Sequence, residues 1–212
     1  MSSDAKNTAI FTVKAQRLRR RVWLLKLVIH CAALLPLLAI YSLAFADQLG
    51  ADPVKAVMHF TGIGGFNLLL LTLTVTPLAK TFRAGYLLKV RRLLGLYSFS
   101  YGLCHVLSFL AFEVQFDWRL FVAEIIDRPY ITIGMTAFTI LLALAITSVS
   151  ALQNKLGKNW QKLHNFVYVA ALLIAWHFYW SVKSNIVEPL IYLLMVLVLL
   201  SLRKQKISRW LR

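Results

Sequence analysis

Apolar residues recur along the chain in six long runs that are separated by short polar segments. The runs cover residues 22 to 46, 57 to 79, 93 to 112, 130 to 151, 163 to 182 and 186 to 202. About 20 consecutive apolar residues suffice for a helix to cross the ~30 Å hydrocarbon core of a bilayer. The pattern predicts an all-α integral membrane protein built as one six-helix bundle.

The composition agrees with this interpretation. Hydrophobic residues make up 59% of the 212 residues, and the mean hydropathy is +0.69. Soluble domains are usually only about half apolar. The runs divide the chain into a basic tail at 1–21, a transmembrane domain at 22–202 and a second basic tail at 203–212.

The charges indicate how the bundle is oriented. With six spans, nineteen Lys and Arg residues fall in the tails and the even-numbered loops. The odd-numbered loops hold seven of the eight acidic residues and four cations, which are Lys55, Arg119, Arg128 and Lys183. The positive-inside rule then predicts that both termini are cytoplasmic. We therefore attribute the net charge of +16 to topology and to contact with anionic lipid, and not to nucleic acid binding.

Several kinds of site are excluded. A c-type haem site needs CxxCH, but Tyr101 stands where the first cysteine would be, three residues before Cys104. Gly62, Gly64 and Gly65 follow no predicted strand, so they favour close helix packing over nucleotide binding. Without a dinucleotide-binding domain the chain cannot take hydride from a nicotinamide, and its electron donor must be a separate molecule.

Two histidines are predicted to lie at the same depth in the bilayer. Spans three and five both run outward, and His105 lies 13 residues beyond Arg92 while His177 lies 15 beyond Lys162. These separations correspond to ~20 and ~22 Å of helix. Two facing imidazoles suit the axial positions of a haem iron held between helices. Alternatively, each histidine only forms a hydrogen bond to a neighbouring helix.

The other histidines allow more than one interpretation. His164 lies near the cytoplasmic rim, either as an interfacial side chain or as a ligand or orienting group for a second redox cofactor. The spacing of 13 residues from His164 to His177 turns a helix through about 220°, so ideal geometry does not align the two side chains. His30 and His59 are further candidates in spans one and two.

Cations gather at the predicted inner ends of spans three to five. They are suited to binding a cofactor phosphate by charge, but topology alone also explains them. They are Arg91, Arg92, Lys155, Lys158 and Lys162.

Several long motifs closely resemble the MsrQ family, formerly YedZ, of the ferric-reductase-like transmembrane group. They are ADPVKAVMHFTG (51 to 62), RRLLGL (91 to 96), RPYITIG (128 to 134), KLGKNWQKLHNFVYV (155 to 169) and WSVK (180 to 183). The resemblance implies a multi-pass, haem-binding subunit of a periplasmic methionine sulfoxide reductase system in the bacterial inner membrane. It implies b-type haem and FMN as cofactors.

The same resemblance implies a non-catalytic electron-transfer role. Electrons would come from the quinone pool or a cytoplasmic flavin reductase and go to the molybdenum-containing partner MsrP. His105, His164 and His177 match the family's haem-related histidines. Larger relatives usually place a further histidine 14 residues before the position of His105, where this chain has Arg91. This departure argues against a symmetric pair of haems with two histidines each.

Two other functions remain open from the sequence. One is a cytochrome b subunit that delivers electrons to quinone. The other is a non-redox transporter or structural membrane subunit whose histidines are merely packed.

Overall fold

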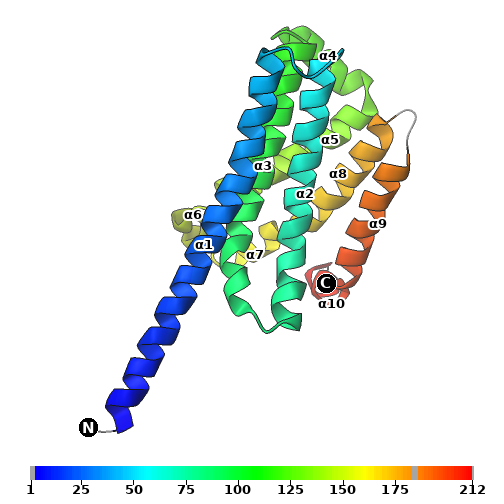
Figure 1. Cartoon of the computed structure of the whole chain (residues 1–212). Coiled ribbons are helices and arrows are strands. Elements are labelled where there is room, and N and C mark those ends of the chain that lie inside the picture. Colours follow the sequence, from blue (N-terminus) through cyan, green and yellow to red (C-terminus); the bar gives the residue numbers. More distant parts are fainter. Residues whose placement is uncertain (1–2, 183–185, 212) are drawn as a thin grey trace.

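The computed structural model describes residues 3–182 and 186–211, with side chains from residue 15 to 210. Lys183, assigned above to an outer loop, lies outside the described residues. The described part of the chain is all-α (Figure 1). Its elements are α1 (Ser3–Phe45), α2 (Pro53–Thr81), the 3-10 helix η1 (Gly85–Val90), α3 (Arg91–Ser108), the π-helical turn η2 (Phe109–Glu113), α4 (Trp118–Asp127), α5 (Pro129–Ile146), α6 (Ser150–Leu156), α7 (Lys158–His164), α8 (Val167–Ser181), α9 (Val187–Ser201) and α10 (Lys204–Leu211).

Several helices are long and apolar enough to cross a membrane. Among the described residues they are Ala15–Phe45, Pro53–Thr81, Gly85–Glu113 and Pro129–Ile146, and Val187–Ser201 is a shorter apolar helix. The prediction of an all-α, multi-pass membrane protein is therefore confirmed. The count of six spans and the cytoplasmic position of both termini stay predictions.

The helix predicted over residues 163 to 182 is interrupted near its start, so the prediction is wrong there. α7 ends at His164, and α8 begins only at Val167. Between them the Phe166 amide donates to the Leu163 carbonyl at 3.0 Å, which closes a tighter turn. The Gln161 side-chain amide donates to Asn165 Oδ1 at 2.9 Å and holds that turn in place.

The apolar run over residues 130 to 151 also does not form one helix. α5 ends at Ile146, and α6 begins at Ser150. The Thr147 hydroxyl donates to the Ala143 carbonyl at 2.6 Å, and the Ser148 hydroxyl donates to the Leu144 carbonyl at 2.8 Å. Hydroxyls that bond locally to the backbone compete with helical hydrogen bonds.

A short helix that the apolar runs do not predict, α4, precedes α5. Asp117 caps it, since its carboxylate accepts from the Arg119 and Leu120 amides at 2.9 and 3.1 Å. With 10 residues, α4 is too short to give the signal of a membrane span. Only its apolar face alternating with charged residues indicates it in the sequence.

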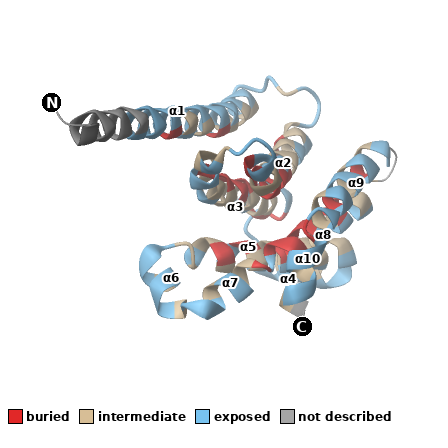
Figure 2. Ribbon diagram, turned by 90° about the horizontal axis from the view of Figure 1, so that it is seen from below, coloured by how far each residue is buried: buried red, intermediate tan, exposed pale blue. Residues whose placement is uncertain are grey.

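The core is formed by close contacts among α2, α3, α5, α8 and α9. Figure 2 shows the buried residues concentrated on α2, α3, α5 and α8, while α1 is largely exposed. Gly64 and Gly65 allow α2 to approach α3, because a Cβ at Gly64 would lie 2.5 Å from the Tyr101 ring. Ser98 of α3 donates to the Gly65 carbonyl at 2.8 Å. The close packing predicted for these glycines is confirmed.

Hydrogen bonds attach α1 to α3. His30 Nδ1 lies 2.5 Å from the Tyr97 hydroxyl, and the Tyr101 hydroxyl donates to the Ala33 carbonyl at 2.6 Å. The first turns of α1 extend beyond the other helices (Figure 1). From residue 15 to the end of α1, most large apolar side chains are exposed, as expected of a helix surrounded by lipid.

The bundle has two ends with different connections. α4 and the α1–α2 connection lie at one end, called the α4 end (Figure 1). The α2–α3 connection and α10 lie at the other, called the α10 end (Figure 1). α3 runs from the α10 end toward the α4 end, and α2 runs in the opposite direction.

Candidate functional site

His105 lies in the last turns of α3, near the α4 end. Its Nδ1 lies 2.9 Å from the Met58 carbonyl oxygen of α2 and 3.4 Å from the Thr61 hydroxyl. The Thr61 hydroxyl itself donates back to the Val57 carbonyl at 2.7 Å. α2 therefore holds the His105 ring with its own backbone.

His177 occupies the equivalent position on α8. Its Nδ1 lies 2.7 Å from the Tyr130 carbonyl oxygen, in the first turn of α5. The Tyr130 ring stacks against the imidazole, with ring centres 6.0 Å apart and planes 27° apart. One carbonyl and one aromatic ring from α5 thus fix the orientation of His177.

These carbonyl contacts determine which nitrogen of each ring is free. A carbonyl oxygen can only accept, so Nδ1 of His105 and of His177 must carry the proton and donate it. The Nε2 lone pair of each neutral ring then remains available. Histidines that ligate metals in proteins commonly donate their second nitrogen to a carbonyl or carboxylate in this way.

The two imidazoles lie side by side. Their ring centres are 6.4 Å apart and their planes are inclined by 84°. Two imidazoles that ligate one metal ion from opposite sides, each at about 2.0 Å, have ring centres roughly 6 Å apart. The prediction that His105 and His177 reach the same depth is met, and their separation fits a shared metal ion.

Two glycines make room for the histidine rings. A Cβ at Gly62 of α2 would lie 3.2 Å from the His105 ring, and a Cβ at Gly134 of α5 would lie 2.8 Å from His177 Nδ1. The second distance is shorter than real Cβ contacts allow, so only glycine fits there without a shift of the ring. Each histidine therefore faces a glycine on the same helix that supplies its carbonyl partner.

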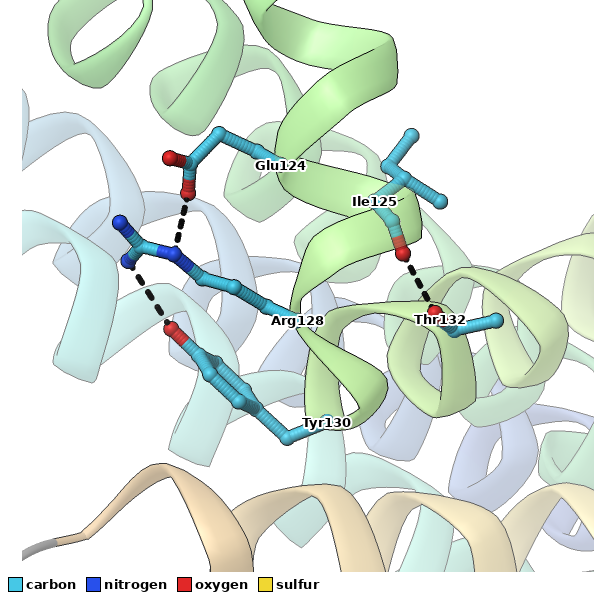
Figure 3. A network of polar contacts seen from close by, with 5 residues as sticks. All are labelled: Glu124, Ile125, Arg128, Tyr130 and Thr132. Atoms are coloured by element: carbon cyan, nitrogen blue, oxygen red, sulfur yellow. Dashed lines mark hydrogen bonds and ion pairs between the residues drawn. The ribbon is translucent and has the colours of Figure 1, made fainter.

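A network of polar contacts holds the α4–α5 junction from which Tyr130 comes (Figure 3). Arg128 forms an ion pair with Glu124 at 2.8 Å and donates to the Tyr130 hydroxyl at 3.4 Å. The Thr132 hydroxyl donates to the Ile125 carbonyl. These contacts explain the RPYITIG motif, since its residues begin α5, support Tyr130 and leave space for His177.

The ligand set fits haem better than a bare metal ion. Within the residues described, no group of three or more His, Cys, Asp or Glu side chains could hold a metal ion. Structural and catalytic metal sites built from side chains use at least three such ligands. A porphyrin supplies four ligands itself and needs only two axial ones. His105 and His177 match that requirement.

His164 does not join this pair. It lies at the end of α7, where its ring stacks on Trp160 with centres 3.9 Å apart, and its Nδ1 lies 3.3 Å from the Trp160 carbonyl. Burial lowers the pKa of His164, and the charge of Arg91 lowers it further. His164 therefore lies close to Arg91, at the α10 end of the bundle.

The remaining candidate histidines also lie apart from the pair. His30 is exposed on α1 and bonds to Tyr97. His59 is exposed on α2, with its ring 6.4 Å from that of Phe178. Both side chains contact an aromatic residue of a neighbouring helix.

The predicted inner cations differ in their surroundings. Arg91 is partly buried, whereas Arg92 and the lysines of α6 and α7 are exposed. Sequence reasoning missed a buried cation near Arg91, which is Arg203, together with its partner Tyr168. The sequence pattern places Arg203 in the basic tail at 203–212, because nothing in the local pattern distinguishes it from its neighbours.

Comparison with known proteins gives two kinds of similarity. Residues 61–175 match the family model described as "Ferric reductase like transmembrane component". The chain is 43% identical over 203 residues to the "Protein-methionine-sulfoxide reductase heme-binding subunit MsrQ" of Klebsiella pneumoniae (strain 342), covering 95% of this chain and 99% of the relative. Relatives with the same name are 42% identical over 194 residues in Cronobacter sakazakii and 44% over 189 residues in Pectobacterium atrosepticum. These matches cover 91% and 89% of this chain, and 97% and 95% of the respective relatives.

Proposed function

Because the chain belongs to the MsrQ family of ferric-reductase-like membrane proteins, we propose that it is the haem-binding electron-transfer subunit of a methionine sulfoxide reductase system. The observation that carries the proposal is the pair of imidazoles at the α4 end, with ring centres 6.4 Å apart. When bound, b-type haem supplies a centre that accepts and releases one electron at a time.

In this function His105 and His177 would hold the haem iron through their Nε2 atoms. The Met58 and Tyr130 carbonyls accept hydrogen bonds from Nδ1, which leaves the Nε2 lone pair of each ring available for the iron. Gly62 and Gly134 leave room for the two rings, since a Cβ at either position would crowd them. Both histidines are partly buried, which limits the access of water to a reduced centre.

We place FMN at the α10 end. Arg91 and Arg92 begin α3 there, and guanidinium groups bind phosphate through paired, charge-assisted hydrogen bonds. His164 lies close to Arg91 and orients this second cofactor or ligates a metal-containing one. The role of Arg91 and Arg92 is to hold the flavin phosphate.

The partners follow from the position of the two ends. With both termini cytoplasmic and six spans in the bacterial inner membrane, the α10 end faces the cytoplasm. A quinone or a cytoplasmic flavin reductase donates electrons there. The acceptor is the periplasmic, molybdenum-containing subunit MsrP, which reduces the methionine sulfoxide. The chain itself catalyses no chemistry on that substrate.

Membrane vesicles of known orientation test this proposal. Haem reduced from the cytoplasmic side should be reoxidised by the periplasmic partner only when its sulfoxide substrate is present. Reoxidation that ignores partner and substrate, or that proceeds only through quinone, would favour the cytochrome b alternative. A folded preparation without haem would favour the transporter or structural alternative.

A further inference from the structure

Arg203 is a buried cation at the α10 end of the bundle. It follows α9 and is only 8% exposed. Its Nη1 group donates to the Tyr168 hydroxyl at 3.2 Å, and its Nη2 group donates to the Leu73 carbonyl of α2. Its guanidinium carbon lies 5.8 Å from the centre of the Tyr168 ring.

Pro77 explains why Arg203 reaches α2. A proline inside a helix has no N–H group and leaves the carbonyl four residues earlier without its helical partner. In α2 that carbonyl belongs to Leu73, a residue with 0% exposure. Arg203 supplies the missing donor from another helix.

This structural role uses only part of the guanidinium group. Arg203 Nε is buried and has no hydrogen-bond partner among the described residues. No acidic side chain of the described residues lies within ion-pair distance of Arg203. A buried charge without a counter-ion is strongly unfavourable, and so is a buried donor without an acceptor.

Two neighbouring cations add to the unpaired positive charge around Arg203. Arg91 lies close enough to Arg203 for their charges to repel each other. Lys206 on α10 is exposed, and the pKa of its amine is lowered, first by partial loss of hydration and also by the charges of Arg91 and Arg203. The other buried side-chain atom without a partner in the described residues, Thr76 Oγ1, lies three residues after Leu73 and so on the same face of α2.

We propose that Arg203, Arg91, Lys206 and Tyr168 form a binding site for a phosphate group. A phosphate carries up to two negative charges and several acceptor oxygens, which suits three cations, a hydroxyl and an unused Nε donor. The group belongs either to flavin mononucleotide or to the headgroup of an anionic phospholipid. The flavin source rests on the proposed function, whereas the phosphate site itself does not.

The test uses the full chain in nanodiscs of phosphatidylcholine, with and without phosphatidylglycerol. Binding of FMN is compared with that of riboflavin, which lacks the phosphate, and inorganic phosphate is added as a competitor. Retained phosphatidylglycerol is measured by mass spectrometry. The variants are Arg203→Gln, Arg203→Lys and Lys206→Gln, and the matched control is Arg209→Gln, an exposed cation of the same helix as Lys206.

If flavin supplies the phosphate, the wild type binds FMN at least about tenfold more tightly than riboflavin. Arg203→Gln removes this preference, Arg203→Lys retains part of it, and Arg209→Gln leaves it unchanged. If lipid supplies the phosphate, Arg203→Gln leaves the preference for FMN over riboflavin unchanged and releases phosphatidylglycerol that Arg209→Gln retains.

The proposal is overturned if Arg203→Gln matches Arg209→Gln in both measurements. If Arg203→Gln does not fold, Lys206→Gln decides, since unchanged binding of flavin and lipid in that variant also overturns the proposal. The haem spectrum of every variant reports on the haem site at His105 and His177, independently of phosphate binding. A variant that loses phosphate binding but keeps normal haem affects only this inference. A protein that binds phosphate normally but lacks haem contradicts only the proposed function.

Discussion

His105 and Arg203 lie at opposite ends of the bundle, and the protein satisfies their polar groups in different ways. At the α4 end, each imidazole donates its Nδ1 proton to a carbonyl of a neighbouring helix and keeps one free lone pair. At the α10 end, a buried guanidinium donates to a carbonyl and a hydroxyl, but within the described residues its Nε has no acceptor and its charge has no counter-ion.

The difference shows what each end still needs. The α4 end presents two lone pairs, and so it is suited to an electron-pair acceptor such as a metal ion. The α10 end presents positive charge and an unused donor, and so it is suited to an anion. In both cases a helix carbonyl binds one nitrogen of the side chain, and we propose that another nitrogen of the same side chain binds the ligand.

The largest expected effect comes from removing a lone pair at the α4 end. His105→Ala or His177→Ala should abolish most low-spin b-type haem, because one axial ligand is lost. The measurement is the reduced-minus-oxidised visible spectrum per mole of purified protein. His30→Ala and His59→Ala serve as controls, since both side chains lie apart from the pair. Equal haem content in all four variants would contradict the assignment of His105 and His177 as haem ligands.

Next in size is the effect of filling the space beside a histidine ring. Gly134→Ala should displace His177 and lower the haem content several-fold, because the new Cβ would lie 2.8 Å from Nδ1. Gly62→Ala should have a smaller effect, since its Cβ would lie 3.2 Å from the His105 ring. Gly102→Ala is the control, with ordinary contact at 3.8 Å. A larger loss of haem in Gly102→Ala than in Gly134→Ala would contradict this geometry.

Residue counting along helices predicted the shared depth of His105 and His177, because helical rise depends only on the number of residues. The carbonyl partners Met58 and Tyr130 were not predictable, since they depend on how α2 and α5 are rotated about their axes. The break after His164 also escaped prediction, because its polar contacts are local while the hydrophobic run continues across it.

Arg203 was beyond sequence reasoning for a different reason. Its acceptor, the Leu73 carbonyl, is 130 residues away, and the need for a donor arises from Pro77 in another helix. The basic residues around Arg203 look alike in the sequence, yet Arg203 is buried while Lys204 and Arg209 are exposed.

A double-mutant cycle tests the structural role of Arg203 at the α10 end. Arg203→Met leaves the Leu73 carbonyl without its donor, a loss of about 1–3 kcal/mol that removal of the unpaired buried charge partly offsets. In a Pro77→Ala background α2 regains its own N–H donor, so the same change should cost less. The measurement is the free energy of unfolding in detergent for the four proteins of the cycle. Additive effects would mean that Arg203 does not compensate for Pro77.

The smallest effect is expected at the α4–α5 junction. Tyr130→Phe removes the hydroxyl that accepts from Arg128 but keeps the carbonyl that holds His177. Since Arg128 is exposed, the loss of stability should stay below about 1 kcal/mol, and haem should be retained. Thermal unfolding and the visible spectrum check both points. A loss of haem comparable to that of His177→Ala would show that the Tyr130 side chain, and not its backbone, holds the imidazole.

The central claim is that the two free lone pairs at the α4 end bind one haem iron from opposite sides. Near-infrared magnetic circular dichroism of the oxidised, purified protein identifies both axial ligands of a haem directly. The structure predicts a low-spin haem with two imidazole nitrogens as axial ligands. A folded protein without haem, or a haem with only one histidine ligand, would contradict the account.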